Sequence, residues 1–491
     1  MKRRDLLKGG LALALGGCAT TPARRDAIRA ENARPGTRDW MLSKTRVDPK
    51  ESFRSPAVEG YVSRQSARAG DTLDFFISAR PASKVRVDLY RMGWYGGDGA
   101  RHMATLGPFP CEPQPDPELG EQRLRSCKWT STTSLKLPGD WLSGVYLGKL
   151  TEEREGLQSY VIFVLRDDRR CDLLLQVSDT TWAAYNRWPH ASSLYDDGKK
   201  AWYWGPGVRV GFDRPYGRYC QIENWPLSQG SGEFLLWEFP LAFWMEKEGY
   251  DVSYISNLDT HHDAAGLLRA KAWISTGHDE YWSRAMFENM KAAVKSGLNV
   301  AFLSADSVLG LIDPSGPGGR AFSRVGVFGD VRPESLKGFP EMARFKPCGL
   351  DEGELLGNRT VHPVIGLADW VCSNAKHWLF EGTGMKDGDG IPGLVGWEWQ
   401  GNPASIPGLE VVARSKLTWG GAEGEYAATV YPGPKGNHVF SCATIWWADG
   451  LSAPPGYRRP TTYGGKPVLL KGPDPRVQRI TANLFERFSR R

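Results

Sequence analysis

The chain has 491 residues, of which 41% are hydrophobic and 24% are charged, and its formal net charge is +6. This length exceeds what a single hydrophobic core usually supports, so we expect two or more domains. The composition is typical of a globular protein and excludes a disordered or fibrous chain. Beyond the N-terminus there is no run rich in lysine and arginine, so we expect no nucleic-acid partner.

The N-terminus is typical of an exported lipoprotein. Lys2-Arg3-Arg4-Asp5-Leu6-Leu7-Lys8 is a twin-arginine pattern, and an apolar run follows it over residues 9–17. That run is too short to span a bilayer, and it ends in Leu15-Gly16-Gly17-Cys18, which resembles a lipobox. We therefore expect residues 1–18 to be a signal and Cys18 to carry a lipid. The protein is then exported and tethered to the periplasmic side of a membrane.

An all-β region follows a polar tether. Residues 19–52 are mainly polar and charged, as in a flexible linker. Over residues 53–168 short alternating runs are separated by turn signals, and the stretch 84–90 alternates most clearly. This spacing predicts an immunoglobulin-like β-sandwich. Cys111 and Cys127 lie in one Pro-rich insertion there, and their spacing suits a local disulfide in an oxidising compartment.

Residues 169–491 have the pattern of an α/β domain. Strand-like and helical stretches alternate, which predicts a parallel sheet with right-handed crossovers. The expected strands of this sheet are short apolar runs, at residues 173–177, 251–256, 273–276 and 298–303. Over residues 311–475 glycine, proline and tryptophan become frequent, and we expect long insertions and added strands. A final helix is expected over about residues 474–489.

The stretch 273–283 is the centre of this domain. Its first half is a buried strand, and Ser283 is a suitable N-cap for a helix that ends at Gly297. Between strand and helix lies a polar loop over residues 277–281, with the sequence Gly-His-Asp-Glu-Tyr. Open α/β folds bind ligands where the carboxyl ends of their strands meet. We therefore expect several loop residues to converge at this edge, namely Tyr185, Asp259, His278, Asp279, Glu280, Tyr281 and Asp306.

Two common kinds of catalytic site are disfavoured. No G-x-S-x-G or G-x-C-x-G elbow follows any of these strands, and Ser275 and Ser304 lack the flanking glycines. None of the eight histidines is paired as H-x-x-x-H or H-E-x-x-H, which argues against a dedicated zinc site. Tyr281 together with carboxylates from other loops would instead suit a hard cation such as ferric iron.

Several motifs resemble the N,N-dimethylformamidase large (beta) subunit family. In chain order they lie at residues 91–97, 181–186, 193–195, 249–254, 277–283 and 382–398. The resemblance covers nearly all of residues 58–455. It implies a glutamine-amidotransferase-like parallel α/β fold for the second domain. It also implies hydrolysis of the C–N bond of a small-molecule amide.

The resemblance further implies one iron ion held by two tyrosines and one glutamate, which polarises the amide carbonyl and activates water. Carried over by position, Tyr281 matches one tyrosine and Glu398 best matches the glutamate. The second tyrosine belongs to a Gly-Asn-x-x-Tyr-Trp motif, where this chain has Asp306 at the asparagine and Leu309 at the tyrosine. Leucine cannot ligate a metal.

The missing tyrosine leaves alternatives open. Asp306, Tyr185 or Asp259 replaces the lost ligand, or the site is empty. Glu398 can also be read as a solvent-facing residue at the edge of an aromatic strand.

If the protein is an amidase, the residues that orient water or act as general base come from His278, Asp279 and Glu280. The rival hypothesis is a non-catalytic protein whose aromatic cleft stacks on a sugar or another flat ligand. Its expected lining is Trp182, Tyr185, Asn186, Trp188 and Tyr195. The sequence leaves open a homo-oligomer or a separate small subunit.

Overall fold

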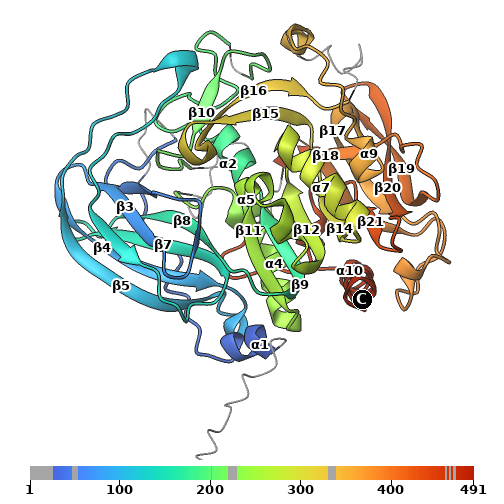
Figure 1. Ribbon diagram of the computed structural model, residues 1–491, viewed down its shortest axis with the longest axis horizontal. Coiled ribbons are helices and arrows are strands. Elements are labelled where there is room, and N and C mark those ends of the chain that lie inside the picture. Colours follow the sequence, from blue (N-terminus) through green and yellow to red (C-terminus); the bar gives the residue numbers. More distant parts are fainter. Residues whose placement is uncertain are drawn as a thin grey trace, which may run out of the picture.

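The computed structural model describes residues 26–46, 53–200, 202–218, 229–329, 339–458, 462–463, 466–467 and 472–490. The expected signal and Cys18 lie outside the described residues. The fold is mixed α/β, with one large, mostly parallel sheet and several smaller, mainly antiparallel sheets. In Figure 1 the blue and cyan strands lie beside the green parallel strands, and the orange strands lie on the opposite side of these. In the described part of the chain, every helix is too short or too polar to cross a membrane.

The N-terminal part contains helix α1 (Ala27–Asn32) and two facing sheets. One has the strand order β1-β3-β6 and the other the order β2-β8-β7-β4-β5. The strands are β1 (Glu59–Val62), β2 (Ser66–Arg68), β3 (Thr72–Ser78), β4 (Ser83–Met92), β5 (Ala100–Cys111), β6 (Thr133–Lys136), β7 (Gly144–Glu152) and β8 (Gln158–Arg166). Alternate residues such as Phe75, Val87 and Phe163 fill one shared core. The region is therefore all-β as predicted, while its immunoglobulin-like topology stays a prediction.

Cys111 and Cys127 do not form the expected disulfide. Both are free thiols. Cys111 packs into the core between the two sheets, whereas Cys127 lies in a separate aromatic cluster with Trp129 and Trp188. The backbone amide of Cys127 donates to the carbonyl oxygen of Asp213 at 2.7 Å, which ties this segment to a different part of the chain. The insertion does fold back on itself, since Gln114 donates to the carbonyl oxygen of Thr130 at 2.9 Å, but its two cysteines point into different clusters.

The large sheet has the order β11-β9-β12-β14-β21-β20-β18-β17, with β19 paired to β20. Neighbouring strands from β11 to β21 are parallel, and the others are antiparallel. The strands are β9 (Cys171–Val177), β11 (Val252–Ser256), β12 (Ala270–His278), β14 (Asn299–Ala305), β17 (Arg359–Val371), β18 (Gly390–Gly401), β19 (Glu410–Trp419), β20 (Ala422–Pro432) and β21 (His438–Ser441). The four expected apolar strands and β21 form the parallel part, and the remaining strands extend it with antiparallel pairing.

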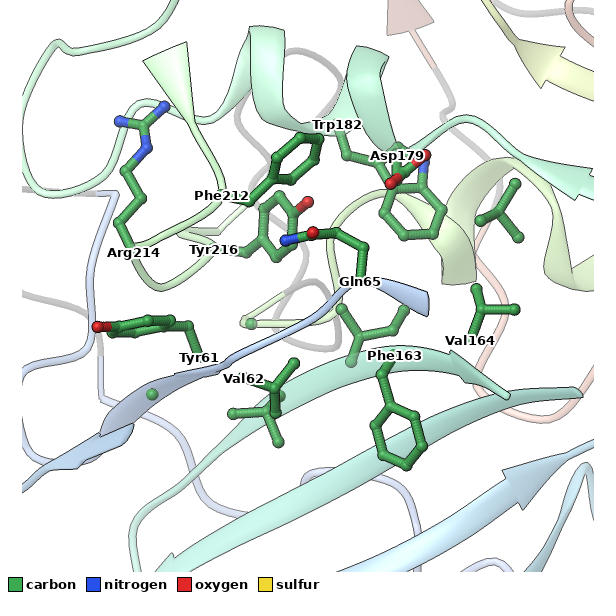
Figure 2. A pocket seen from close by; sticks show the side chains of 15 residues that line it. Tyr61, Val62, Gln65, Phe163, Val164, Asp179, Trp182, Phe212, Arg214 and Tyr216 are labelled. Atoms are coloured by element: carbon green, nitrogen blue, oxygen red, sulfur yellow. The ribbon is translucent and has the colours of Figure 1, made fainter. Parts of the chain in front are cut away.

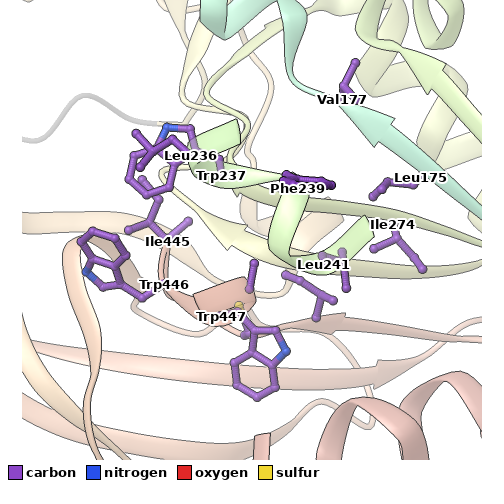
Figure 3. Close-up of a cluster of buried hydrophobic side chains, with 14 of the residues drawn as sticks. Leu175, Val177, Leu236, Trp237, Phe239, Leu241, Ile274, Ile445, Trp446 and Trp447 are labelled. Atoms are coloured by element: carbon purple, nitrogen blue, oxygen red, sulfur yellow. The ribbon is translucent and has the colours of Figure 1, made fainter. Parts of the chain in front are cut away.

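Helices cover both faces of this sheet. They are α2 (Asp179–Tyr185), α3 (Phe234–Trp237), α4 (Phe239–Glu248), α5 (Asn257–His262), α6 (Ala264–Leu267), α7 (Arg284–Ser296), α9 (Gly353–Leu356) and α10 (Pro475–Ser489). Successive strand residues point to opposite faces, so Trp273 packs in the cluster that contains the apolar side of α7. On the other face, Leu175 and Ile274 lie in the cluster that contains Leu241 of α4 (Figure 3). Ser283 caps α7 and Gly297 ends it, as predicted.

A second sheet begins at the carboxyl end of β12. Its order is β10-β16-β15-β13. Its strands are β10 (Arg209–Gly211), β13 (Tyr281–Ser283), β15 (Gly310–Ser315) and β16 (Ala321–Val327). A two-stranded sheet of β22 (Thr462–Tyr463) and β23 (Lys466–Pro467) lies near the C-terminus. The predicted five-residue loop is shorter in the structure, because β12 and β13 take up most of it. Strand β12 continues through His278, and Tyr281 pairs with Gly310 in parallel register. Only Asp279 and Glu280 remain between the two strands.

A buried ion pair joins the N-terminal sheets to the α/β part. Arg91 of β4 donates to both carboxylate oxygens of Glu246 in α4, at 2.8 and 2.9 Å. Both side chains are fully buried. The hydroxyl of Tyr254 also donates to Glu246 at 2.8 Å. A Cβ atom at Gly93 would lie 2.4 Å from Glu246 Oε2, so the close approach requires glycine there. The motif at residues 91–97 therefore forms a structural junction.

Candidate metal centre

Four ionisable side chains converge at the carboxyl edge of the parallel strands. His278 ends β12, Glu280 lies in the turn after it, and Asp306 directly follows β14. Because β12 and β14 are parallel, with His278 opposite Ala305, their carboxyl ends lie at the same edge. Glu398 reaches the same point from β18. We call these residues, His278, Glu280, Asp306 and Glu398, the His278 cluster.

The donor atoms of the His278 cluster are close together and buried. His278 Nε2 lies 2.9 Å from Glu398 Oε2 and 3.1 Å from Glu280 Oε2. One ligand atom each from His278, Glu280 and Asp306 lies within 4.8 Å of the others. The least buried member is Glu398, which is 7% exposed. Imidazole nitrogen and carboxylate oxygen are common ligands of transition metals. The cluster is therefore a candidate metal site.

Several of these atoms have no hydrogen-bond partner among the described residues. Both ring nitrogens of His278 are unpartnered, and so is Oε2 of Glu398, although Nε2 and Oε2 are close. Nε2 and Oε2 are close enough for a hydrogen bond, but the angles at these atoms do not meet hydrogen-bond geometry. A buried polar atom without a partner costs about 1–3 kcal/mol. A metal ion bound beside the carboxylates would satisfy Nε2 of His278, which is the nitrogen that faces them.

The charge balance of the His278 cluster also favours a cation. Three carboxyl groups surround one imidazole in a buried site. Burial raises the pKa of Asp306 well above its ordinary range, and the carboxylates of Glu398 and Glu280 raise it further. Burial lowers the pKa of His278, but the same two carboxylates outweigh it and leave this pKa well above its ordinary value. A metal ion would compete with protons at these groups, because metal ligands bind in their deprotonated form.

Strained backbone surrounds the cluster. Asp306, Val308 and Trp397 have φ angles of 49°, 59° and 57°, in the left-handed region. Bulky and β-branched residues rarely adopt it, and each instance costs about 1–3 kcal/mol. Two of these residues form the loop after β14, and the third directly precedes Glu398. Strain of this kind is typical of functional sites because the surrounding structure must hold it in place.

Three tyrosine hydroxyls connect Glu280 to Arg324. Arg324 Nη2 donates to Tyr281 Oη at 2.9 Å, and Tyr281 donates to Tyr195 at 2.6 Å. Tyr195 donates to Tyr185 at 2.7 Å, and Tyr185 donates to Glu280 Oε2 at 2.7 Å. Burial raises the pKa of all three phenols well above its ordinary value. The phenols are therefore protonated hydrogen-bond donors.

Two candidate residues do not join the cluster. The oxygens of Asp279 accept hydrogen bonds from the amides of Gln176 and Asn257, both at 3.0 Å, so its carboxylate braces β9 and α5 against the turn. Burial raises the pKa of Asp279 to about 6. Asp259 follows the parallel strand β11 and so lies at the predicted edge, but its side chain does not join the cluster. Its side chain forms the capping box at the start of α5 and pairs with Arg166 at 3.1 Å.

The residues expected to line a stacking cleft are buried in different places. Tyr185 and Tyr195 belong to the hydrogen-bonded chain described above. Trp188 packs edge-on against Trp129, with ring centroids 6.0 Å apart, in a separate aromatic cluster. Asn186 donates to a backbone carbonyl at 2.9 Å and supports a loop. The structure therefore does not bring these residues together on one open surface.

Trp182, the remaining residue of that set, lines a small cavity between the N-terminal sheets and α2 (Figure 2). The cavity volume is about 20 Å³, which suits a single water molecule. Asp179 and Tyr216 supply polar groups to its wall, and Val62 and Phe163 supply apolar ones. No residue of the His278 cluster lines this cavity. It is therefore separate from the candidate metal centre.

Comparison with known families identifies relatives of this chain. Residues 86–461 match the family described as N,N-dimethylformamidase beta subunit-like, C-terminal. The chain belongs to this family. A comparison with curated proteins finds no match. One similar solved structure is Bacteroides uniformis beta-glucuronidase 2 covalently bound to cyclophellitol-6-carboxylate aziridine, at 10% identity. The similarity covers 50% of this chain and 33% of that chain, with a TM-score of 0.13 that supports no statement about fold.

The iron site implied by the resemblance does not fit this dimethylformamidase-like chain. Leu309 occupies the position of the second tyrosine. The hydroxyl of Tyr281, the first tyrosine, is hydrogen-bonded to Tyr195 and Arg324. The guanidinium is a permanent positive charge that repels a metal ion at the same oxygen. The residues that fit a metal ion are those of the His278 cluster.

Arg324 was not among the site residues predicted from the sequence. It lies in β16, is 2% exposed and stacks on the ring of Trp204, with its central carbon 3.8 Å from the ring centroid. The local sequence contains no motif that marks it. The local signal is its position two residues after Phe322, which places both side chains on the buried face of the strand. Glu280 was predicted as a catalytic group, whereas the structure places it among the candidate metal ligands.

Proposed function

We propose that this protein is a metal-dependent hydrolase that cleaves the C–N bond of small-molecule amides. Membership of the dimethylformamidase beta subunit-like family supports the reaction class. The observation that carries the proposal is the convergence of His278, Glu280 and Asp306, whose donor atoms lie within 4.8 Å of one another in a buried site. The unpartnered Nε2 of His278 supports a bound ion there.

The residues of the cluster have separable roles in this proposal. His278, Glu280 and Asp306 hold the metal ion. A metal ion at this position supplies Lewis acidity, which polarises an amide carbonyl and lowers the pKa of water. Glu398 is the most exposed member, and its Oε2 has no hydrogen-bond partner among the described residues. This oxygen accepts the proton of the attacking water and returns it to the departing amine nitrogen.

Metal analysis tests the site. Protein purified after export through its own signal should contain about one transition-metal ion per chain, and His278→Ala and Asp306→Asn should lose it. His102 is a matched control, because it lies on β5 with its side chain 45% exposed and far in sequence from the cluster. His102→Ala should retain the metal. A wild-type protein without metal would refute the proposal.

A separate assay tests the reaction. Amine release from a panel of small N-substituted amides should depend on the bound metal. Glu398→Gln should retain the metal and lose about 10²–10⁴-fold in rate, the usual contribution of a general base. Wild-type protein that holds metal but hydrolyses no amide would instead support the rival binding protein.

We also propose that the chain is exported and anchored through Cys18. The twin-arginine pattern over residues 2–8 and the lipobox-like ending at Cys18 support this. Cell fractionation tests it directly. Cys18→Ala should move the protein from the membrane fraction to the soluble one, and replacement of Arg3 and Arg4 by lysine should stop export. Unchanged fractionation of Cys18→Ala would contradict the anchor.

A further inference from the structure

We propose that Tyr281 does not ligate the metal ion and that Arg324, Tyr281, Tyr195 and Tyr185 form a hydrogen-bonded chain that positions Glu280. This inference rests on the proposed metal site and departs from the tyrosine-ligated iron that the resemblance implies. The four residues are positioning residues, because they act on the centre through the carboxylate of Glu280.

The hydrogen bonds of Tyr281 argue against ligation. A phenol hydroxyl has one proton to donate and oxygen lone pairs that accept. Tyr281 donates its proton to Tyr195 at 2.6 Å and accepts from Arg324 Nη2 at 2.9 Å. A metal ligand would have to give up this proton, and the acceptor Tyr195 would lose its donor. Tyr281 is therefore a neutral phenol whose hydroxyl both donates and accepts a hydrogen bond.

The charge of Arg324 strengthens this argument. Its side chain is 2% exposed and stacks against Trp204, Tyr195 and Tyr281, with its central carbon 3.8, 4.9 and 5.5 Å from the ring centroids. Among the described residues, no carboxylate lies within 4.0 Å of this guanidinium. A metal ion on Tyr281 would place a second positive charge beside it in a buried site. Arg324 therefore keeps the ion on the His278 side of the tyrosines.

The other end of the chain fixes the Glu280 carboxylate. Tyr185 Oη is 2.7 Å from Oε2, and Tyr195 Oη is 3.1 Å from Oε1. The backbone amide of Glu280 donates to Thr181 Oγ1 at 3.0 Å. Tyr185 thus holds Oε2, which also lies 3.1 Å from His278 Nε2, while the single proton of Tyr195 goes to Tyr185. Groups that orient a ligand in this way typically contribute 10–100-fold to metal affinity.

Visible spectroscopy of the wild-type protein provides the first test. A tyrosine bound to ferric iron gives a strong visible charge-transfer band, whereas a centre of imidazole and carboxylates does not. Ferric-loaded wild-type protein should lack this band. A band that disappears in Tyr281→Phe would overturn the inference. The wild-type measurement does not depend on whether any variant folds.

Metal titration of variants provides the second test. Glu280→Gln should abolish binding of Co²⁺, used as the probe. Tyr281→Phe should still bind one Co²⁺ per chain, with affinity reduced about 10-fold, and Tyr185→Phe should also shift the visible Co²⁺ spectrum because Glu280 reorients. Tyr216→Phe is the matched control, because the Tyr216 hydroxyl is buried without a partner among the described residues. It should change neither property.

The outcomes separate this inference from the proposed function. Loss of Co²⁺ from Tyr281→Phe to the same extent as from Glu280→Gln would overturn the positioning role while leaving the metal site intact. Unchanged affinity and an unchanged Co²⁺ spectrum in Tyr185→Phe would also overturn it. Failure of the wild-type protein to bind Co²⁺ would overturn the proposed metal site, and the inference would fail with it.

Discussion

His278 Nε2 and Glu398 Oε2 lie 2.9 Å apart, although they come from strands that are remote in the sequence. His278 ends β12 in the parallel part of the large sheet, and Glu398 lies on β18 in its antiparallel part. The two halves of the sheet therefore meet at the candidate metal centre. The antiparallel strands contribute Glu398 to this centre, in addition to the residues that follow the parallel strands.

Removal of the metal ion should destabilise the protein. An ion that binds only the folded chain stabilises it by about 2.7 kcal/mol at a concentration 100 times its Kd. A chelator should therefore lower the unfolding temperature measured by calorimetry. In Asp306→Asn the chelator should have little effect, because the ion is already absent. An equal shift in both proteins would show that the chelator acts elsewhere.

Gly277→Ala should be strongly destabilising. Gly277 has a φ of +72°, and a Cβ atom there would lie 2.5 Å from Cβ of Trp237. Gly96→Ala is a matched control, because Gly96 has a φ of +69° and a ψ of +11°, and a Cβ atom there would meet no other atom within 4 Å. The control should cost about 1–2 kcal/mol from backbone strain alone, and Gly277→Ala several kcal/mol more. Equal losses in urea unfolding would contradict the clash.

Arg91→Met should cost about 3–5 kcal/mol of unfolding free energy, because Glu246 is left as a buried charge without its partner. Arg86→Ala provides the comparison. Arg86 pairs with Asp88 at 2.8 Å on the same strand, but its side chain is 49% exposed. Such a pair contributes at most about 1 kcal/mol. Denaturant unfolding of both variants measures the difference, and similar losses would argue against the buried junction.

Glu238 should make stability depend on pH. Burial, with a contribution from Glu233, raises the pKa of Glu238 from 4.5 to about 8. Between these values the folded chain keeps a proton that the unfolded chain has lost. The free energy of unfolding therefore falls as pH rises, by up to about 1.4 kcal/mol per unit. Burial also raises the pKa values of Asp179 and Glu233 to about 8, so Glu238→Gln should reduce this slope between pH 5 and 8 without abolishing it. An unchanged slope would show that Glu238 does not hold a proton in the folded chain.

The parallel core and its helices could be predicted from local patterns. The strands are short apolar runs buried on both faces, and Ser283 and Gly297 set the ends of α7 through local hydrogen bonds and backbone conformation. Strand β13 could not be predicted in this way. It has three residues, and its pairing with Gly310 depends on a segment later in the chain.

The candidate site was predictable only in part. The carboxyl ends of parallel strands meet at one edge of a sheet. This rule correctly placed Tyr185, His278, Glu280 and Asp306 near one another. Asp259 also follows a parallel strand, but a local capping hydrogen bond holds its side chain at the start of α5 and outside the cluster. Arg324 could not be anticipated, since its role depends on stacking between aromatic rings from separate segments.

The most direct test of the metal centre is anomalous X-ray diffraction from crystals of the metal-loaded protein, measured at the absorption edge of the bound ion. We expect one strong peak about 2.0–2.2 Å from His278 Nε2 and from carboxylate oxygens of Glu280 and Asp306, with the hydroxyl of Tyr281 still hydrogen-bonded to Arg324. A peak bonded to Tyr281, or no peak at the His278 cluster, would contradict this expectation.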